Sequence, residues 1–104
     1  LQLFASGSTK QAPINLGSNF PGNTSTTDVD ELALFAPAAS DNVYWQVTRI
    51  NTGDIAAGVI SNGGGVTAPS STSLLSYLQA WRSNNTTAAA VAFDVMSDYI
   101  ETDQ

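Results

Sequence analysis

Apolar and polar residues alternate through much of the chain, and turn-forming residues interrupt the alternation about every eight to twelve positions. The clearest alternation spans residues 43–50, where Val43, Trp45 and Val47 fall on one face of an extended backbone. β-Branched and aromatic residues dominate this segment, as they do in strands. The pattern predicts a strand in which Trp45 belongs to the buried face.

Two further strands are predicted beside this one. Residues 31–36 end at Pro37, which cannot donate a hydrogen bond to a central ladder and therefore marks the end of a strand. Residues 51–54, with the sequence NTGD, suit a turn and predict a hairpin into a strand at 55–60. The amino-terminal quarter contains two weaker strand candidates and then a loop rich in small polar residues: 1–5, 13–16 and 17–27.

The carboxy-terminal part of the chain is harder to interpret. Leucine and tryptophan residues in 72–83 have helical spacing, but alternate residues there also suit one face of a strand. We favour a strand, because the neighbouring elements are predicted strands. A glycine-rich break at 62–65 precedes this segment, and an extended run is expected at 88–101, with a helix starting at 88–90 as the alternative. Together the segments predict an all-β domain.

Composition excludes several classes of function. The chain has 104 residues, no cysteine, no histidine and a formal net charge of −6. A thiolate nucleophile, a zinc or iron–sulfur site of usual ligation and a Ser-His-Asp triad are therefore excluded from this sequence. Its three Lys and Arg residues are too few to bind a nucleic-acid backbone. Apolar runs fall well short of the roughly 20 residues that cross a bilayer, so no membrane insertion is expected.

Carboxylates gather where the strand at 31–36 is predicted to begin. Asp28, Asp30 and Glu31 offer the oxygen ligands that Ca²⁺ prefers, so they are the candidate metal site. Their spacing lacks the pattern of an EF-hand loop. The alternative is a solvated strand entrance, and we favour it, so no cofactor is expected.

A second group of acids lies near the carboxy terminus. Asp94 and Asp98 share a face of the predicted last strand, as do Glu101 and Asp103. Two such carboxylates can act as general acid and base in a glycan hydrolase or lyase. In a net-acidic chain they more often form a solvated edge, and we expect no catalysis.

Aromatic residues beside polar ones are the candidates for binding carbohydrate. Tyr44, Tyr77 and Trp81 present flat rings on which the apolar face of a sugar can stack, whereas Trp45 is assigned to the core. The neighbouring Arg82 and Asn84 can donate hydrogen bonds to the ligand. Arginines also suggest a carboxylate or phosphate clamp, formed by Arg49 and Arg82; the equally favoured alternative is pairing with an acid of the chain or of a neighbouring subunit.

Four segments resemble the carboxy-terminal β-sandwich region of tail fibres, tailspikes and related virion-surface proteins of tailed bacteriophages. They are ELALFAP at 31–37, YWQVTRINTG at 44–53, WRSNNTTAAAVA at 81–92 and YIETD at 99–103. The resemblance covers residues 28–104. It implies a small jelly-roll or concanavalin-like β-sandwich over 28–104, preceded by an extended arm or weak strands at 1–27.

The resemblance also implies a homotrimer on the virion surface that caps a fibre, contacts other virion proteins and binds host-surface carbohydrate without catalysis. Complete sandwiches of this kind are longer, so either the fold is minimal or neighbouring subunits complete it. The edges of the predicted sheets favour association independently of the resemblance. Lysine side chains often protect edge strands from pairing, and a short β chain with almost no lysine must pair or cover its sheet edges in another way. The alternatives are an architectural capsid-decoration or fibre-stabilising protein without ligand, and the glycan hydrolase or lyase.

Overall fold

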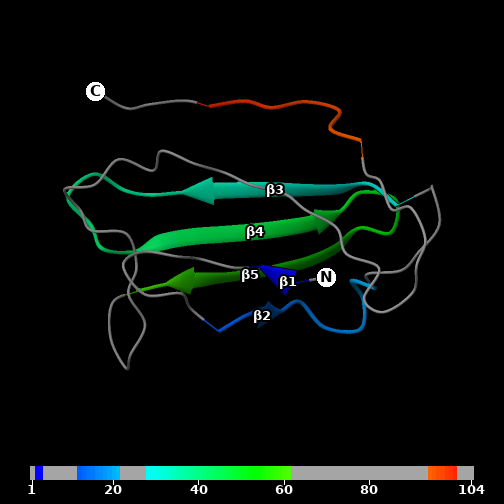
Figure 1. The fold of residues 1–104 in the computed structure, drawn as a ribbon, viewed down its shortest axis with the longest axis horizontal. Coiled ribbons are helices and arrows are strands. Elements are labelled where there is room, and N and C mark those ends of the chain that lie inside the picture. The colour runs from blue at the N-terminus through cyan, green and yellow to red at the C-terminus, as the bar shows by residue number, and fades with distance from the viewer. Residues whose placement is uncertain (1, 4–11, 22–27, 62–93, 101–104) are drawn as a thin grey trace, which may run out of the picture. The chain divides into compact units, whose positions relative to one another are not determined.

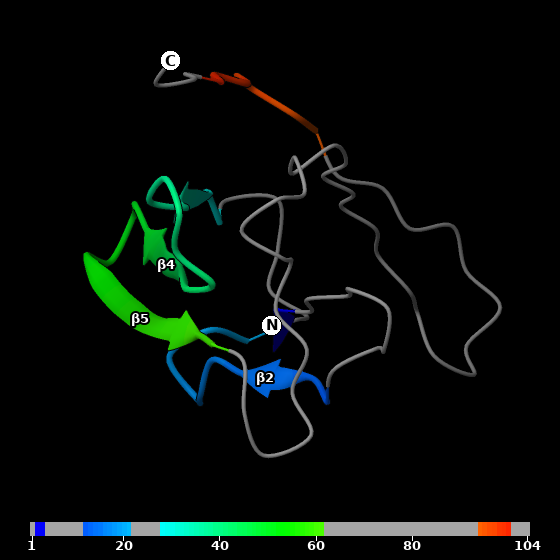
Figure 2. The same cartoon turned by 90° about the vertical axis from the view of Figure 1, so that its left-hand side faces the viewer.

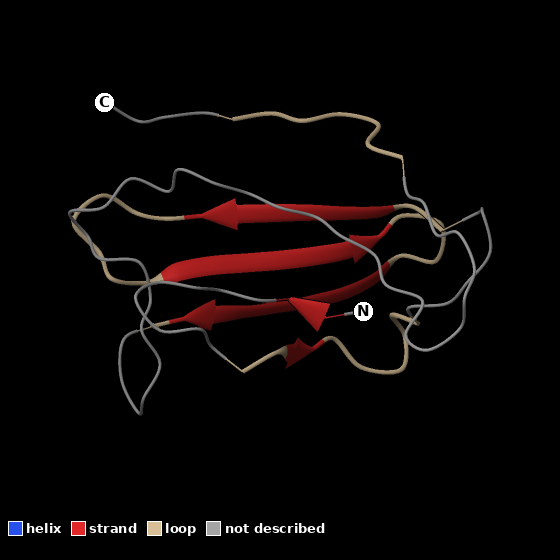
Figure 3. Cartoon of the chain, in the orientation of Figure 1, coloured by secondary structure: helices blue, strands red, loops and turns tan. Residues whose placement is uncertain are grey.

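Five strands make up the regular structure of the residues that can be described. The computed structural model describes residues 2–3, 12–21, 28–61 and 94–100. The strands are β1 (Gln2–Leu3), β2 (Ile14–Asn15), β3 (Asp30–Phe35), β4 (Val43–Arg49) and β5 (Asp54–Ile60). The described residues contain no helix (Figure 3), so none that could span a membrane is found among them. The predicted all-β class is confirmed for this part of the chain.

The chain divides into two compact units, Leu1–Leu74 and Leu75–Gln104, and all five strands belong to the first. Strands β1 and β2 form a short antiparallel pair, with Leu3 opposite Ile14. Strands β3, β4 and β5 form an antiparallel sheet in sequence order (Figure 1). These elements match the strand candidates at 1–5, 13–16, 31–36, 43–50 and 55–60.

A four-residue turn joins β4 to β5 and confirms the predicted hairpin. The backbone carbonyl of Arg49 accepts hydrogen bonds from the backbone amides of Gly53, at 2.8 Å, and Thr52, at 3.2 Å. Gly53 has a φ of 78°, and a Cβ there would meet no atom within 4 Å. The turn therefore requires glycine for its left-handed backbone conformation, which other residues adopt at a cost.

Register divides the side chains of the larger sheet between two faces, because directly paired residues of antiparallel strands share a face. Val47 pairs with Leu32 and Ala56, which places Trp45 and Val47 on what we call the inner face. The opposite, outer face carries the alternate residues. Its members are Glu31, Ala33 and Phe35 of β3, Tyr44, Gln46 and Thr48 of β4, and Ile55, Ala57 and Val59 of β5.

The hydrophobic core lies on the inner face of β4 and β5. It consists of Leu16, Phe20, Val43, Trp45, Val47 and Ile60, with Leu3, Ile14 and Ala56 packed against it. Figure 2 shows β2 on one side of the larger sheet, which is the side of this core. Trp45 is only 8% exposed, so its assignment to the core is confirmed.

Phe20 was not predicted to be part of the core, because it falls in the segment interpreted as a polar loop. Its backbone amide donates to the carbonyl of Gly17 at 3.2 Å, and Gly17 has a φ of 93°. This turn brings Phe20 back onto the core, where it is almost fully buried. Turn geometry rather than alternation determines its position, and alternation was the signal used to locate strands.

The expected last strand is wrong for its described part. Residues 94–100 form no strand, and all seven are exposed. Val95 and Met96 would lie on opposite faces of a strand, yet both are exposed. Alternation there therefore does not reflect a buried face, and a strand also needs a ladder partner. The predicted elements at 62–65, 72–83 and 88–93 lie outside the described residues.

Trp45 and Gly58 are direct cross-strand partners on the inner face. A Cβ built on Gly58 would lie 2.7 Å from Cζ2 and 2.9 Å from Cε2 of Trp45. These distances are too short for carbon atoms, so the indole occupies the space that a side chain at position 58 would need. Gly58 therefore allows the large ring to lie against the backbone of β5.

We predict that Gly58→Ala lowers the free energy of unfolding by about 1–3 kcal/mol, the usual cost of overpacking a core. The direction of this change is informative, since replacing a glycine in a strand by alanine otherwise tends to raise the free energy of unfolding. Chemical denaturation of Gly58→Ala, Trp45→Phe and the double variant measures the coupling. The cost of Gly58→Ala should fall by more than half in the Trp45→Phe background, because Phe lacks the clashing ring atoms. An equal cost in both backgrounds would contradict this packing.

Candidate functional site

An open depression of about 250 Å³ lies on the sheet where β3 and β4 pair. Its lining residues are Ala33, Leu34, Phe35, Tyr44, Trp45 and Gln46. Four of them form two adjacent cross-strand pairs of the outer face, Phe35 with Tyr44 and Ala33 with Gln46. Most of its lining therefore belongs to the outer face, and the Leu34–Trp45 pair lies between these two pairs along the strands. Ala33 leaves space between the larger side chains.

Two aromatic rings form one side of this depression. The ring centroids of Phe35 and Tyr44 are 6.3 Å apart and the ring planes are inclined by 34°. Phe35 is 65% exposed and Tyr44 is 43% exposed, so both rings present area to solvent. Val59 pairs with Tyr44 on the other side and continues the apolar row across all three strands. The outer face thus carries an aromatic and aliphatic row at one end.

Neutral polar groups lie next to the aromatic row. The side-chain amide of Gln46 donates to Oγ1 of Thr48 at 3.2 Å, which holds the amide along β4. Gln46 is exposed and lines the depression. A ligand stacked on Phe35 and Tyr44 would therefore meet one amide that can both donate and accept hydrogen bonds.

Tyr44 is the one predicted carbohydrate-binding residue that the structure describes. It is exposed on the outer face, as predicted from the alternation in β4. Tyr77, Trp81, Arg82 and Asn84 lie outside the described residues. Phe35 was missed as a site residue, although its position just before Pro37 in an alternating segment placed it in a strand. Its pairing with Tyr44 depends on the β3–β4 register, which alternation alone does not determine.

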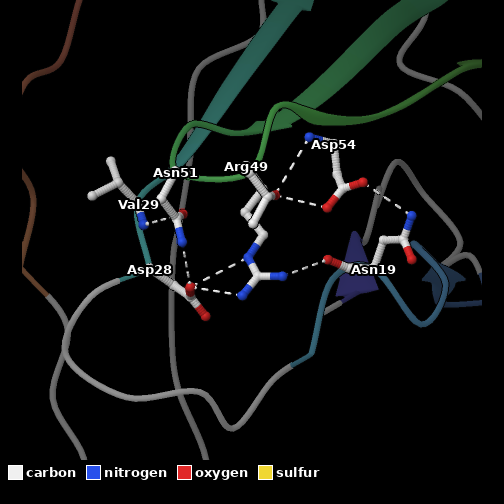
Figure 4. Close-up of polar contacts among 7 residues, drawn as sticks. Asn19, Asp28, Val29, Arg49, Asn51 and Asp54 are labelled. Carbon is white, nitrogen blue, oxygen red and sulfur yellow. Dashed lines mark hydrogen bonds and ion pairs between the residues drawn. The ribbon is translucent and has the colours of Figure 1, made fainter.

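A cluster of polar contacts lies at the other end of the sheet (Figure 4). Oδ1 of Asp28 accepts hydrogen bonds from Nη2 of Arg49 at 2.8 Å, from Nε of Arg49 at 3.3 Å and from the amide of Asn51 at 2.9 Å. Nη1 of Arg49 donates to the backbone carbonyl of Asn19 at 3.1 Å. Arg49 therefore pairs with an acid of its own chain, which was one of its two predicted roles.

The same cluster also holds the β4–β5 turn. Oδ1 of Asp54 accepts from the amide of Asn19 at 3.1 Å, and Oδ2 of Asp54 accepts from the hydroxyl of Thr52 at 2.7 Å. The segment around Asn19 and the residues before β3 are thus both attached to the end of this hairpin. These contacts therefore have a structural role, because they link parts of the chain that are distant in sequence.

The three predicted calcium ligands do not converge. Asp28 is engaged by Arg49, which neutralises its charge. Asp30 lies on the inner face opposite Arg49, and Glu31 lies on the outer face, because successive strand residues point to opposite sides. Within the described ranges no group of three acidic residues is arranged to hold a metal ion. Asp30 and Glu31 are exposed, as expected of a solvated strand entrance, whereas Asp28 is largely buried in its ion pair with Arg49.

No family model, curated protein or solved structure matches this chain. Its likeness to virion-surface proteins therefore remains a resemblance of four segments. The outer face provides the structural basis for a functional proposal.

Arg49 and its neighbours shift the pKa values of two aspartates in opposite directions. Hydrogen bonds from Arg49 and Asn51 lower the pKa of Asp28 below its ordinary value of 3.8. Desolvation, with repulsion from Asp28 as a smaller cause, raises the pKa of Asp30. Ionised Asp28 therefore stabilises the fold above its ordinary pKa, and this contribution is lost as the pH falls below 3.8. Ionised Asp30 destabilises the fold, and this destabilisation is absent in acid, where the carboxyl is protonated in both the folded and the unfolded state.

We predict that Asp28→Asn lowers the melting temperature at pH 7 and lowers it less in acid well below pH 3.8, where the contribution of the ionised carboxyl is progressively lost. Asp30→Asn, the matched control two residues away, should raise the melting temperature at pH 7 and have little effect in acid. Thermal unfolding followed by circular dichroism at both pH values measures both effects. A loss of equal size at both pH values in Asp28→Asn would contradict a role for its charge.

Proposed function

We propose that this chain is a non-catalytic structural module of a bacteriophage fibre or spike that binds host-surface carbohydrate. The main support for carbohydrate binding is the exposed Phe35–Tyr44 pair beside Gln46 on the outer face. Aromatic rings offer large apolar area together with defined geometry, and a sugar ring has an apolar C–H face that such rings can cover. The neighbouring amide can pair with sugar hydroxyls.

The size of the depression favours contact on one side of the ligand. About 250 Å³ is below the roughly 300–1,000 Å³ of pockets that enclose a small molecule. A polysaccharide chain lying across the sheet would keep its other side in water. Such contact is weak at a single site, and several copies on one particle would raise the effective affinity through effective concentration.

Assembly is the second part of the proposal, and we propose a homotrimer. Leu32 and Leu34 point to the inner face of β3 but remain 39% and 44% exposed, because the core covers β4 and β5. Among the described strands none pairs with the outer edge of β3. An open edge beside exposed leucines favours pairing with a further strand. Such pairing would extend the two sheets into a small jelly-roll or concanavalin-like sandwich.

An architectural role without ligand is supported by the same exposed leucines. Assembly alone would cover Leu32 and Leu34 but would leave the outer aromatic row without a role. Asp94 and Asp98, the described candidates for a hydrolase or lyase, lie in an exposed segment outside any strand. Water solvates carboxylates in such positions, so we do not propose catalysis.

We predict that Tyr44→Ala reduces binding to host cells or immobilised host polysaccharide by about fivefold to tenfold, as loss of an aromatic anchor commonly does. Ile55→Ala is the matched control, since Ile55 is an exposed apolar residue at the opposite end of the same face. It should bind like the wild type. Cell pull-down with the labelled full chain measures both variants, and equal binding by all three proteins would contradict the proposed site.

We also predict that light scattering gives a mass three times that of one chain. Leu34→Lys should lower this mass, because a charge at an edge strand opposes pairing. Thr48→Lys adds the same charge on the outer face of the central strand and should leave the mass unchanged. Circular dichroism of each variant checks that the strands are retained. A monomeric wild type at all concentrations would contradict the assembly.

A further inference from the structure

The charges around the outer-face depression restrict which sugars can bind there. Glu31 is the single charged side chain among the described outer-face residues, and it is an acid. The loop that joins β3 to β4 beside Phe35 and Tyr44 contains an acid, Asp41, and no base. An anionic sugar would therefore find no described positive partner on this face.

Arg49 does not supply such a partner. It is the one Lys or Arg among the described residues, and its inner-face guanidinium is bound by Asp28 at 2.8 Å and by the carbonyl of Asn19 at 3.1 Å. Binding of carboxylate, sulfate or phosphate groups in proteins usually depends on Arg or Lys, often through paired hydrogen bonds. Turning Arg49 to the outer face would break the ion pair and leave Asp28 without its positively charged partner.

The groups that do line the depression suit an uncharged ligand. Phe35 and Tyr44 contribute apolar area, and Gln46 contributes one amide. Sugar hydroxyls and N-acetyl groups can exchange hydrogen bonds with this amide without a counter-charge. Burying a carboxylate against the aromatic rings would instead remove its hydration without compensation.

We infer that the outer face selects neutral polysaccharides, built from hexoses or N-acetylhexosamines, over those carrying uronic acid, sialic acid, sulfate or phosphate. This selectivity rests on the proposed carbohydrate-binding function and specifies its ligand. Binding to this face should be insensitive to salt, because none of its described residues offers a cation to the ligand. It differs in this respect from glycan recognition through arginine clamps.

The test is binding of the full chain to an array of bacterial polysaccharides sorted by charge, at low and high NaCl. We expect binding to neutral members that changes less than about twofold with salt and falls about fivefold to tenfold in Tyr44→Ala, as loss of an aromatic anchor commonly does. Ile55→Ala again serves as the control and should match the wild type.

A second variant tests the role of charge directly. Gln46→Lys places a cation beside the rings and should raise binding to anionic members about twofold to fivefold, the range expected of one exposed ion pair. The gain should disappear at high salt. Circular dichroism confirms that the variant retains its strands.

Three outcomes would overturn the inference. Binding of the wild type mainly to anionic members, lost in Tyr44→Ala, would refute the neutral selectivity while leaving the proposed function standing. Wild-type binding to neutral members that salt abolishes would also refute it. Absence of any Tyr44-dependent binding across the array would refute the proposed function itself, and the selectivity with it.

Discussion

Burial of Trp45 against Gly58 is the contact on which the arrangement of the sheet depends. The indole lies where a side chain of β5 would otherwise stand, and the observed register places a glycine directly opposite it. Successive residues of a strand point to opposite faces. Placing Trp45 inside therefore places Tyr44 and Gln46 outside, and a slip of one residue would exchange them. The outer aromatic row is thus a consequence of core packing.

The polar cluster at the opposite end of the sheet complements this contact. Asp28, Arg49 and Asn51 join the chain before β3 to the end of β4, while Asn19 joins an earlier segment to the same hairpin. One hydrogen-bonding group of the cluster is not satisfied within the described part of the chain, because Oδ2 of Asp28 is buried there without a partner. Nε1 of Trp45 is likewise buried in the core with no hydrogen-bond partner among the described residues. Burying a polar group without a hydrogen-bond partner costs free energy of folding.

The hairpin was predicted from the turn residues at 51–54, whereas alternation predicted the faces of β4, because one face of that strand is buried. Each apolar residue there has a direct energetic reason for its position. Phe20 could not be found in this way, since a turn at Gly17 determines where its side chain goes. The strand predicted over 94–100 is wrong for the opposite reason: the residue types alternate there, but the residues of both expected faces are exposed. Periodicity indicates a strand only where it coincides with burial.

The candidate site was predicted in part for the same reason. Tyr44 was found because it alternates with core residues of its own strand. Phe35 belongs to the candidate site only because it pairs with Tyr44 of the neighbouring strand. The pairing of strands is a long-range property that the local sequence pattern does not specify. The predicted calcium ligands failed to converge because adjacency in sequence separates residues of a strand onto two faces. Asp30 and Glu31 are neighbours along the chain and are directed away from each other in the sheet.

Strand β3 serves the two parts of the proposed function with its two faces. Its inner face exposes Leu32 and Leu34, aliphatic side chains without a polar group, and such a surface is best covered by protein. Its outer face carries Phe35 next to the phenol of Tyr44 and the amide of Gln46. That mixture of apolar and hydrogen-bonding groups can remain in water and still hold a hydrated ligand. Assembly through one face would therefore leave the other free, and each additional subunit would add a further copy of the proposed sugar-binding surface to the assembly.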